Sequence, residues 1–505
     1  MLQTIPLPVL LTLSATTLAV TSAEYRPCEP LKFNHDSVVC ACNATYCDNL
    51  PPLPAPAAGT AVVVTSSRAG ARFQRVSAAA ARQQVLGFGG AFTDAAGVNL
   101  AQLPAAARAR LIGSYYGADG IGYSVARVPM AGCDFSTRPY TYDDVPGDTA
   151  LANFSLTRED TEYKLPYLQL ALNLTAGKVR VFASPWSAPA WMKSNNALNG
   201  RGHLLPEYYQ TWADYFVRFL EEYEAAGVPI WGVTTQNEPV DGLVPGFSFN
   251  CMGWTAETQG SWVRDNLGPT LRASAFNATK VMILDDQREM LPAWADVVLA
   301  DEETASYVDG IAIHWYGDPF FPASALTATH DRHPNKFLLN TEACEGSYPW
   351  EPQKVELGSW RRAQTYAADI IRDLNHWVTG WVDWNIALDM NGGPNWVSNF
   401  VDSPVIVDAE QQRFYKQPMF YAMGHFAAFL PPGSTVVDAA SEEGHVLAMA
   451  ALTPDGHMVA TLLNQADQEA EISLTDPVKG HLDLTLPAAS LTTVKWQHEQ
   501  SGAGR

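Results

Sequence analysis

Two glutamates at the ends of β-prone segments are the residues of this sequence best placed to do chemistry. Glu238 ends the run 230–238, and Pro239, which cannot donate to a β-ladder and favours an extended residue before it, closes that strand. Glu342 stands near the end of the run 336–344. A glutamate at a strand end is more often a solvated loop residue. Two carboxylates at the same ends of barrel strands, however, indicate acid and nucleophile chemistry on a glycosidic bond.

The two glutamates fall within a regular succession of strands and helices. Helical patterns fill most of the gaps between the strands, as in 208–226, where large apolar residues recur at helical spacing. Eight such strands predict a (β/α)8 TIM barrel, in which catalytic groups lie at the carboxyl ends of the strands. An open doubly wound sheet is the competing architecture. The predicted strands are 85–92, 122–130, 178–186, 230–238, 280–286, 309–316, 336–342 and 378–385.

Polar and aromatic residues gather at the carboxyl ends of these predicted strands, whereas the amino ends look ordinary. Aromatic faces pack against the apolar face of a sugar ring, so tryptophans at these ends favour a carbohydrate site. The residues at the carboxyl ends are Arg127, Trp186, Asn237, Glu238, Asp285, His314, Tyr316, Glu342, Asp383 and Trp384.

Two smaller regions accompany the predicted barrel. Residues 24–51 form a short Cys-rich module, which a stiff proline-rich linker follows. From Ser434 onward the pattern is one of short strands, which predicts a β-sandwich. The segments 61–64 and 71–76 could form a hairpin that supplies its first strands. The segment 415–430 is predicted to be the last barrel helix.

The net charge and the first 23 residues predict a chain that enters the secretory pathway. The 505 residues carry a formal net charge of −21, which repels nucleic acid and suits a compartment acidic enough to protonate part of the carboxylates. Residues 1–23 have the apolar run and small-residue end of a signal peptide. The alternative, a membrane anchor, needs about 20 apolar residues, more than this run contains.

Four of the seven cysteines crowd into the module near the amino terminus. In a secreted chain the group Cys28, Cys40, Cys42 and Cys47 suggests two disulfide bridges. A metal site would need a Cys-x-x-Cys pair or paired histidines, and neither is present. N-glycosylation sequons begin at Asn43, Asn153, Asn173 and Asn277.

Other chemistries find no support in the sequence. The glycine-rich run 87–92 resembles half of a dinucleotide-binding fingerprint, but Phe92 stands where the third glycine belongs. The sequence contains no P-loop and no His-Glu-x-x-His zinc motif. We therefore expect neither a cofactor nor a metal, and we expect His314 to be a core or hydrogen-bonding residue.

Several motifs together identify a family. They include Asn237-Glu238-Pro239, Leu284-Asp285-Asp286-Gln287-Arg288, Glu342-Ala343-Cys344, Gly393-Pro394-Asn395-Trp396 and the run 414–420. On these and on similar stretches over nearly the whole mature chain, the sequence closely resembles glycoside hydrolase family 30. Asn-Glu-Pro alone marks only a wider clan, so the family assignment rests on the full set.

The resemblance implies roles for particular residues. Glu238 would be the acid/base and Glu342 the nucleophile, which Arg127 and Tyr316 would hold. Asp134, Trp186, Asn237, Trp384 and Asn399 would bind the glucose hydroxyls, and Phe135, Phe249 and Trp350 would line the entrance where a lipid lies.

The resemblance also implies a function and a domain plan. The expected activity is retaining hydrolysis of glucosylceramide in the lysosomal lumen, at a membrane surface and with a saposin-type activator. The alternatives are a secreted glycosidase acting on another glycoside or polysaccharide, and a non-enzymatic glycan- or lipid-binding carrier. The predicted parts are 24–51 with 386–417 as a small β domain, 52–83 with 434–497 as the β-sandwich, 84–385 with 418–433 as the barrel, and 498–505 as a tail.

Two residues that follow Glu342 raise separate questions. Glu345 stands where the family typically has an apolar residue, and strand parity directs its side chain away from Glu342. Cys344 falls on the same strand face as Glu342, so we expect it to border the pocket; an inert buried thiol is the alternative.

Overall fold

The computed structural model describes residues 26–49, 61–68, 81–439, 444–476 and 480–498. The predicted signal peptide, the proline-rich linker and the segment 71–76 of the predicted hairpin lie outside these residues. No helix within the described ranges is long and apolar enough to cross a membrane.

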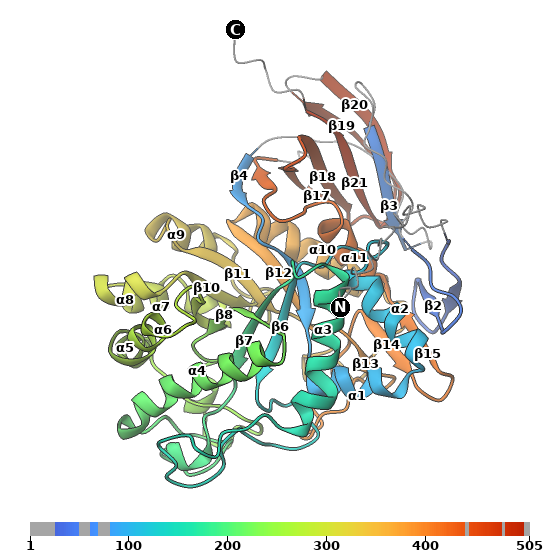
Figure 1. Cartoon of the computed structure of the whole chain (residues 1–505). Helices are drawn as coiled ribbons and strands as arrows, with labels where there is room; N and C mark the ends of the chain where they lie inside the picture. Colours follow the sequence, from blue (N-terminus) through green and yellow to red (C-terminus); the bar gives the residue numbers. More distant parts are fainter. Residues whose placement is uncertain (1–25, 50–60, 69–80, 440–443, 477–479, 499–505) are drawn as a thin grey trace, which may run out of the picture.

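A closed parallel barrel of eight strands forms the centre of the molecule (Figure 1). The open sheet considered as the competing architecture is therefore wrong. Neighbouring strands pair in parallel all the way round, and β5 closes the ring against β12. The strands are β5 (Gly87–Ala91), β6 (Val125–Met130), β7 (Arg180–Pro185), β8 (Ile230–Thr234), β9 (Lys280–Gln287), β10 (Gly310–His314), β11 (Phe337–Glu342) and β12 (Val378–Asn385).

Helices surround the barrel, and the long helix α4 (Tyr209–Ala225) shows the amphipathic pattern that packs a helix against it. In α4, the residues Trp212, Phe216 and Phe219 are fully buried, while charged residues face solvent. The other helices are α1 (Asp94–Gln102), α2 (Ala105–Tyr116), α3 (Leu165–Leu174), α5 (Ala256–Trp262), α6 (Gly268–Ala273), α7 (Ala293–Val298), α8 (Glu302–Tyr307), α9 (Ser324–Arg332), α10 (Trp360–Asn375) and α11 (Pro418–Ala427).

The barrel interior is packed at one end and polar at the other. Val125, Phe182, Met282, Ala312, Leu339 and Val382, one from each of six strands, form a buried apolar cluster. Val125 and Arg127 are two residues apart on β6, so both side chains point into the barrel. Gly89 lets β5 approach β6 closely, because a Cβ there would lie 2.0 Å from the carbonyl oxygen of Val125. The apolar cluster thus forms a floor for the polar groups at the carboxyl ends.

A five-stranded sheet joins the amino-terminal module to a segment that follows the barrel. Its order is β1 (Pro30–Lys32), β2 (Val38–Cys42), β15 (Arg413–Lys416), β14 (Val405–Asp408) and β13 (Leu388–Asp389). Two disulfides, Cys28–Cys40 and Cys42–Cys47, fasten β2 and the turn after it. The four cysteines therefore pair as two bridges, as the sequence suggested.

The remaining strands form the sandwich that packs on α10 and α11 (Figure 1). His425 of α11 bridges to it, since its ring nitrogens hydrogen-bond Thr493 at 2.8 Å and Ser66 at 3.0 Å. One sheet has the order β3 (Ala61–Ser67), β21 (Ser490–Gln497), β18 (His457–Asn464), β17 (Val446–Leu452), β16 (Thr435–Val437) and β4 (Ala81–Gln84), and a second pairs β19 (Ala470–Asp476) with β20 (Gly480–Leu486).

Two local predictions are wrong. The helix predicted for 415–430 begins only at Pro418, because Tyr415 and Lys416 pair with β14 and β2 as part of β15. The strand predicted to end at Glu238 ends at Thr234. The domain boundaries given above stay predictions.

Candidate active site

Glu238 and Glu342 meet at the carboxyl end of the barrel. Glu342 ends β11, and Glu238 lies in the loop after β8. One oxygen of each carboxyl and one ring nitrogen of His314 all lie within 4.8 Å of one another. Two carboxyls this close suit direct attack by one of them, since about 5–5.5 Å separates the pair in retaining glycosidases.

The backbone at Glu238 is not extended, although Pro239 follows it. Its φ is +42°, in the left-handed region that non-glycine residues seldom adopt. Tertiary hydrogen bonds hold it there, because its N–H donates to the carbonyl of Asp285 at 2.9 Å and its carbonyl accepts from Asp241 at 3.1 Å. The expected influence of the proline is therefore outweighed, and the turn aims the side chain at Glu342.

Arg127 is the central cation of the site. Its side chain is fully buried, and its guanidinium pairs with Glu342 and, at 3.0 Å, with Asp285. It also donates to Oδ1 of Asn237 at 2.8 Å. On the other side of Glu342, the Tyr316 hydroxyl donates to the carboxylate at 2.8 Å. Burial raises the pKa of Glu342, whereas the charges on His314 and Arg127 act to lower it.

His314 links the two glutamates to Asp285. Its Nε2 lies 3.0 Å from Asp285 and its Nδ1 lies 3.2 Å from Glu238. Burial alone would lower the pKa of His314, but the charge of Glu342 and the bonds to Asp285 and Glu238 raise it to about 10. Both ring nitrogens then carry protons, so one donates to Asp285 and the other to Glu238. As expected, His314 acts as a hydrogen-bonding residue.

Asp285 keeps its charge despite full burial. Burial acts to raise its pKa, but the Arg127 guanidinium and the hydrogen bonds from His314 and Thr234 outweigh that effect and lower it. The carboxylate thus fixes both cations of the site. The sequence placed Asp285 at a strand end but gave it no role, because its partners come from other strands.

A small cavity of about 170 Å³ opens beside the two glutamates. The Trp186 and Trp384 rings stack with centroids 5.2 Å apart, and Arg127 lies against both. Asp134, buried at the edge, accepts from Asn399 at 3.0 Å. The lining residues are Asp134, Phe135, Trp186, Glu238, Phe249, Tyr316, Glu342, Cys344, Ser347, Trp384, Asn399 and Val401.

The structure therefore brings the two glutamates and the residues predicted to bind the sugar together at the carboxyl end of the barrel. Cys344 borders the cavity, with its Sγ 3.3 Å from the Tyr316 hydroxyl. Trp350 does not line this cavity. It stacks on Tyr348, with centroids 4.6 Å apart, and lines a second cavity of about 510 Å³. Its expected role at the lipid entrance stays a prediction.

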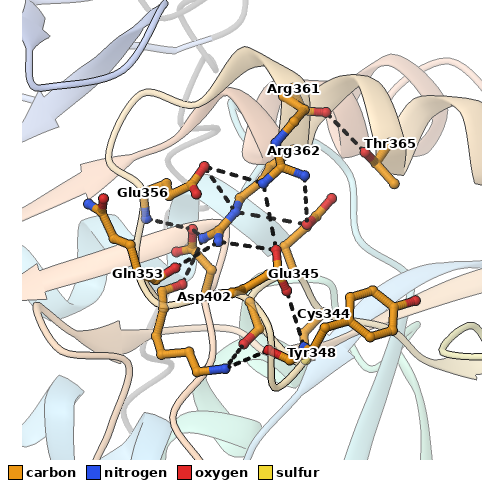
Figure 2. Close-up of polar contacts among 12 residues, drawn as sticks. Cys344, Glu345, Tyr348, Gln353, Glu356, Arg361, Arg362, Thr365 and Asp402 are labelled. Atoms are coloured by element: carbon orange, nitrogen blue, oxygen red, sulfur yellow. Dashed lines mark hydrogen bonds and ion pairs between the residues drawn. The ribbon is translucent and has the colours of Figure 1, made fainter.

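The segment after Glu342 ends in a buried ionic cluster (Figure 2). Glu345 lines the larger cavity, and its Oε2 lies 3.8 Å from both Arg361 and Arg362. Arg362 also pairs with Asp402, and the Asp402 N–H donates to the carbonyl of Glu345 at 2.9 Å. Burial raises the pKa of Glu345 to about 7, against the lowering effect of the two arginines. The cluster binds this segment to α10 and to the loop that carries Asp402.

The sequon asparagines lie at the surface. Asn153, Asn173 and Asn277 are exposed, and Asn43 is half-buried in the turn after β2. Their glycosylation stays a prediction.

Comparisons with known proteins agree with this geometry. The glycosyl hydrolase family 30 TIM-barrel domain matches residues 85–430, and the beta sandwich domain of that family matches residues 433–494. The chain is 46% identical over 497 residues to the lysosomal acid glucosylceramidase of Mus musculus. The alignment covers 94% of this chain and 96% of the mouse protein.

Solved structures resemble it as well. SrfJ from Salmonella typhimurium superposes with a TM-score of 0.79 at 28% identity, over 87% of this chain and 100% of that one. The endo-beta1,6-glucanase BT3312 superposes with a TM-score of 0.78 at 26% identity, over 86% and 99%. The predicted barrel and sandwich are both confirmed.

The raised pKa of Glu345 predicts a pH-dependent stability. Its folded-state pKa is about 7, above the ordinary 4.5, so its contribution to stability is fully present below pH 4.5 and is lost as the pH rises through 7. Over that window the wild type loses on the order of 3 kcal/mol relative to a side chain that cannot ionise. In thermal unfolding, the stability of Glu345→Gln relative to the wild type should therefore increase as the pH rises from 4.5 to 8.

Glu410→Gln is the matched control, because Glu410 is exposed in the turn between β14 and β15. The stability difference between Glu410→Gln and the wild type should stay constant over the same pH range. The prediction would be contradicted if the stability of Glu345→Gln relative to the wild type stayed constant or fell as the pH rises.

Proposed function

Because the chain belongs to glycoside hydrolase family 30, we propose that it is a retaining β-glucosidase that hydrolyses glucosylceramide to glucose and ceramide. The observation that carries this function is the pair of carboxyls, Glu238 and Glu342, whose oxygens lie within 4.8 Å across one small cavity. The similarity to a mammalian glucosylceramidase over nearly the full length of both chains supports the substrate.

In the first step Glu342 is the nucleophile. Arg127 and Tyr316 hold its carboxylate in a fixed orientation, so that one oxygen attacks the anomeric carbon. Glu238 donates a proton to the oxygen of the aglycone as the glycosidic bond breaks. The products are a glucosyl ester on Glu342 and the free alcohol.

In the second step water hydrolyses the ester. Glu238, now ionised, takes a proton from the water while the water oxygen attacks the anomeric carbon. Glucose leaves with its β configuration, and Glu342 returns as a carboxylate. The buried charges of Arg127 and His314 stabilise the two carboxylates between these steps.

The remaining site residues would hold the sugar. Asp134 and Asn399, which hydrogen-bond each other, offer acceptors and donors for the glucose hydroxyls at one edge of the cavity. Asn237, held by Arg127, offers an amide beside Glu238. Trp186 and Trp384 supply aromatic surface to the sugar, and Phe249 also lines the cavity.

A lipid aglycone suits the rim of the barrel. Five large apolar side chains are more than one-third exposed on loops that follow β8, β10 and β11, the same end as the site. Exposed apolar groups gathered around a site are typical of contact with a lipid surface. They are Leu243, Val244, Phe320, Phe321 and Trp350.

The compartment and partners follow from this substrate. We place the enzyme in the lysosomal lumen, reached through the secretory pathway and associated with membranes, and secretion is the alternative. An acidic lumen reduces the repulsion between a chain of net charge −21 and anionic lipid. A saposin-type activator would assist at that surface.

A secreted glucanase is the second candidate. The similarity to the endo-beta1,6-glucanase BT3312 favours it, because that protein superposes on 86% of this chain with a TM-score of 0.78. The two functions share their chemistry and differ in the aglycone, so substrate assays separate them.

The roles of the two glutamates predict distinct losses. Glu342→Gln should reduce hydrolysis of glucosylceramide and of aryl β-glucosides to background, because no ester can form. Glu238→Gln should lower kcat about 10²–10⁴-fold on substrates with poor leaving groups and less on activated ones. NMR of the sugar released by the wild type should detect β-glucose first. Wild-type activity in Glu342→Gln, or α-glucose as first product, would disprove the assignment.

The apolar rim predicts a separate effect on lipid substrate. The double variant Phe320→Ser/Trp350→Ser should lower turnover of glucosylceramide in vesicles roughly tenfold, since it removes exposed apolar surface from the rim. Hydrolysis of a soluble aryl β-glucoside should stay within about twofold, because neither residue lines the small cavity. Leu174→Ser is the control, an exposed apolar residue at the end of α3. An equal loss on both substrates, or turnover of β-1,6-glucan without turnover of lipid, would contradict the lipid assignment.

A further inference from the structure

A second acidic residue follows Glu238 by three positions. Asp241 begins the short turn Asp241–Leu243, and its N–H donates to the carbonyl of Glu238 at 3.1 Å. This closed turn, together with the left-handed backbone at Glu238, brings the two carboxyls together, and their side chains hydrogen-bond each other. Two carboxyls can form such a bond only when one of them carries a proton.

The two members of this pair face different surroundings. Oε1 of Glu238 accepts from Nε2 of Gln287 at 3.1 Å and lies 3.2 Å from protonated His314. Asp241 is surrounded by acidic groups, because Asp286 of β9 and Glu342 of β11 both repel its charge and the Cys251 thiol is close by. The strongest electrostatic influences on Asp241 all come from other carboxyl groups.

These surroundings raise the pKa of Asp241 and lower that of Glu238. Burial raises the pKa of Asp241 to about 11, with a further rise from the charge of Glu238 and the bond to it. Burial also acts to raise the pKa of Glu238, but the hydrogen bond and charge of His314 outweigh it, and the pKa falls. Asp286, also buried and close to Glu238, has a pKa raised to about 8. The pair therefore holds one proton at acidic and neutral pH.

If the function proposed above holds, we propose that Asp241 is a positioning residue for proton transfer: it shares one proton with Glu238, and the pair, not Glu238 alone, supplies the acid and base of the reaction. The shared proton moves along the hydrogen bond onto Glu238 and passes to the aglycone oxygen as the glycosidic bond breaks. Both carboxyls are then ionised. The water that cleaves the glucosyl ester returns one proton to the pair.

This arrangement reconciles two demands on Glu238. A general acid must hold a proton at the working pH, yet the contact with His314 favours an ionised Glu238. The adjacent carboxyl keeps a proton within one hydrogen bond of Glu238 while that contact is maintained. The repulsion between two ionised carboxylates in the intermediate also makes the pair a stronger base toward water.

Asp241→Asn tests the proposal, because an amide keeps the size and a donor but cannot release a proton. On an alkyl β-glucoside, whose departure needs an acid, kcat/KM should fall roughly tenfold or more. The basic limb of its pH profile should move to lower pH by about one unit or more. On 2,4-dinitrophenyl β-glucoside, whose leaving group needs no acid, kcat/KM should be almost unchanged.

Controls separate this proposal from a structural effect and from failure of the proposed function. Glu257→Gln, at an exposed glutamate in the first turn of α5, should leave both substrates and the pH profile unchanged. A merely structural role for Asp241 would lower activity on both glucosides alike. If Asp241→Asn does not fold, Asp241→Ser is used in the same assays. Serine is smaller and is still a hydrogen-bond donor, so the expected results are the same.

The proposed role of Asp241 would be overturned if Asp241→Asn left the basic limb of the pH profile unchanged and changed kcat/KM equally on both glucosides. Failure of the proposed function looks different, because Glu342→Gln would then keep its activity on both glucosides whatever happens at Asp241.

Discussion

The burial of one guanidinium among several carboxylates is the constraint on which the site depends. Arg127 is fully buried inside the barrel, where an isolated charge would cost several kcal/mol. Asp285 and Glu342 compensate it through direct ion pairs, and Asn237 takes a further N–H. Removal of Asp285 or Glu342 would leave the buried charges unbalanced at the centre of the molecule. Protein stability and the orientation of the nucleophile therefore rest on the same contacts.

The barrel makes this arrangement possible because its parallel strands all end at one rim. Arg127, Asp285, His314 and Glu342 come from β6, β9, β10 and β11, and no two are neighbours in sequence. The apolar floor around Val125 and Leu339 seals the other end, so the charges act in a region of low dielectric. Electrostatic effects are strong there, and they raise the pKa of His314 to about 10 while that of Asp285 falls. A proton or a charge added at one residue is therefore felt by every other member of the cluster.

The sequence predicted the positions that regular patterns fix and missed those that tertiary contacts decide. Seven of the eight barrel strands could be read from short β-prone runs to within a few residues, and so could the pair of carboxylates. The end of β8 and the backbone of Glu238 could not, because the bond from Glu238 to the carbonyl of Asp285 spans two strands. The direction of the Trp350 side chain could not be read from the sequence either, since loop packing on Tyr348 decides it. Asp241 gave only the weak signal of a carboxylate three residues beyond Glu238.

Acidic residues outnumber basic ones in the whole chain as well as in the site. The chain carries 53 acidic against 32 basic residues, and two buried carboxyls outside the catalytic pair, Glu345 and Asp134, have pKa values raised to about 7 by burial. Each of these groups is ionised at a cost at neutral pH and is neutral at pH 5. The same protons also reduce the net negative charge that opposes contact with anionic lipid. An acidic compartment thus favours the folded state, the proton content of the site and access to a membrane substrate by one physical effect, the neutralisation of carboxylates.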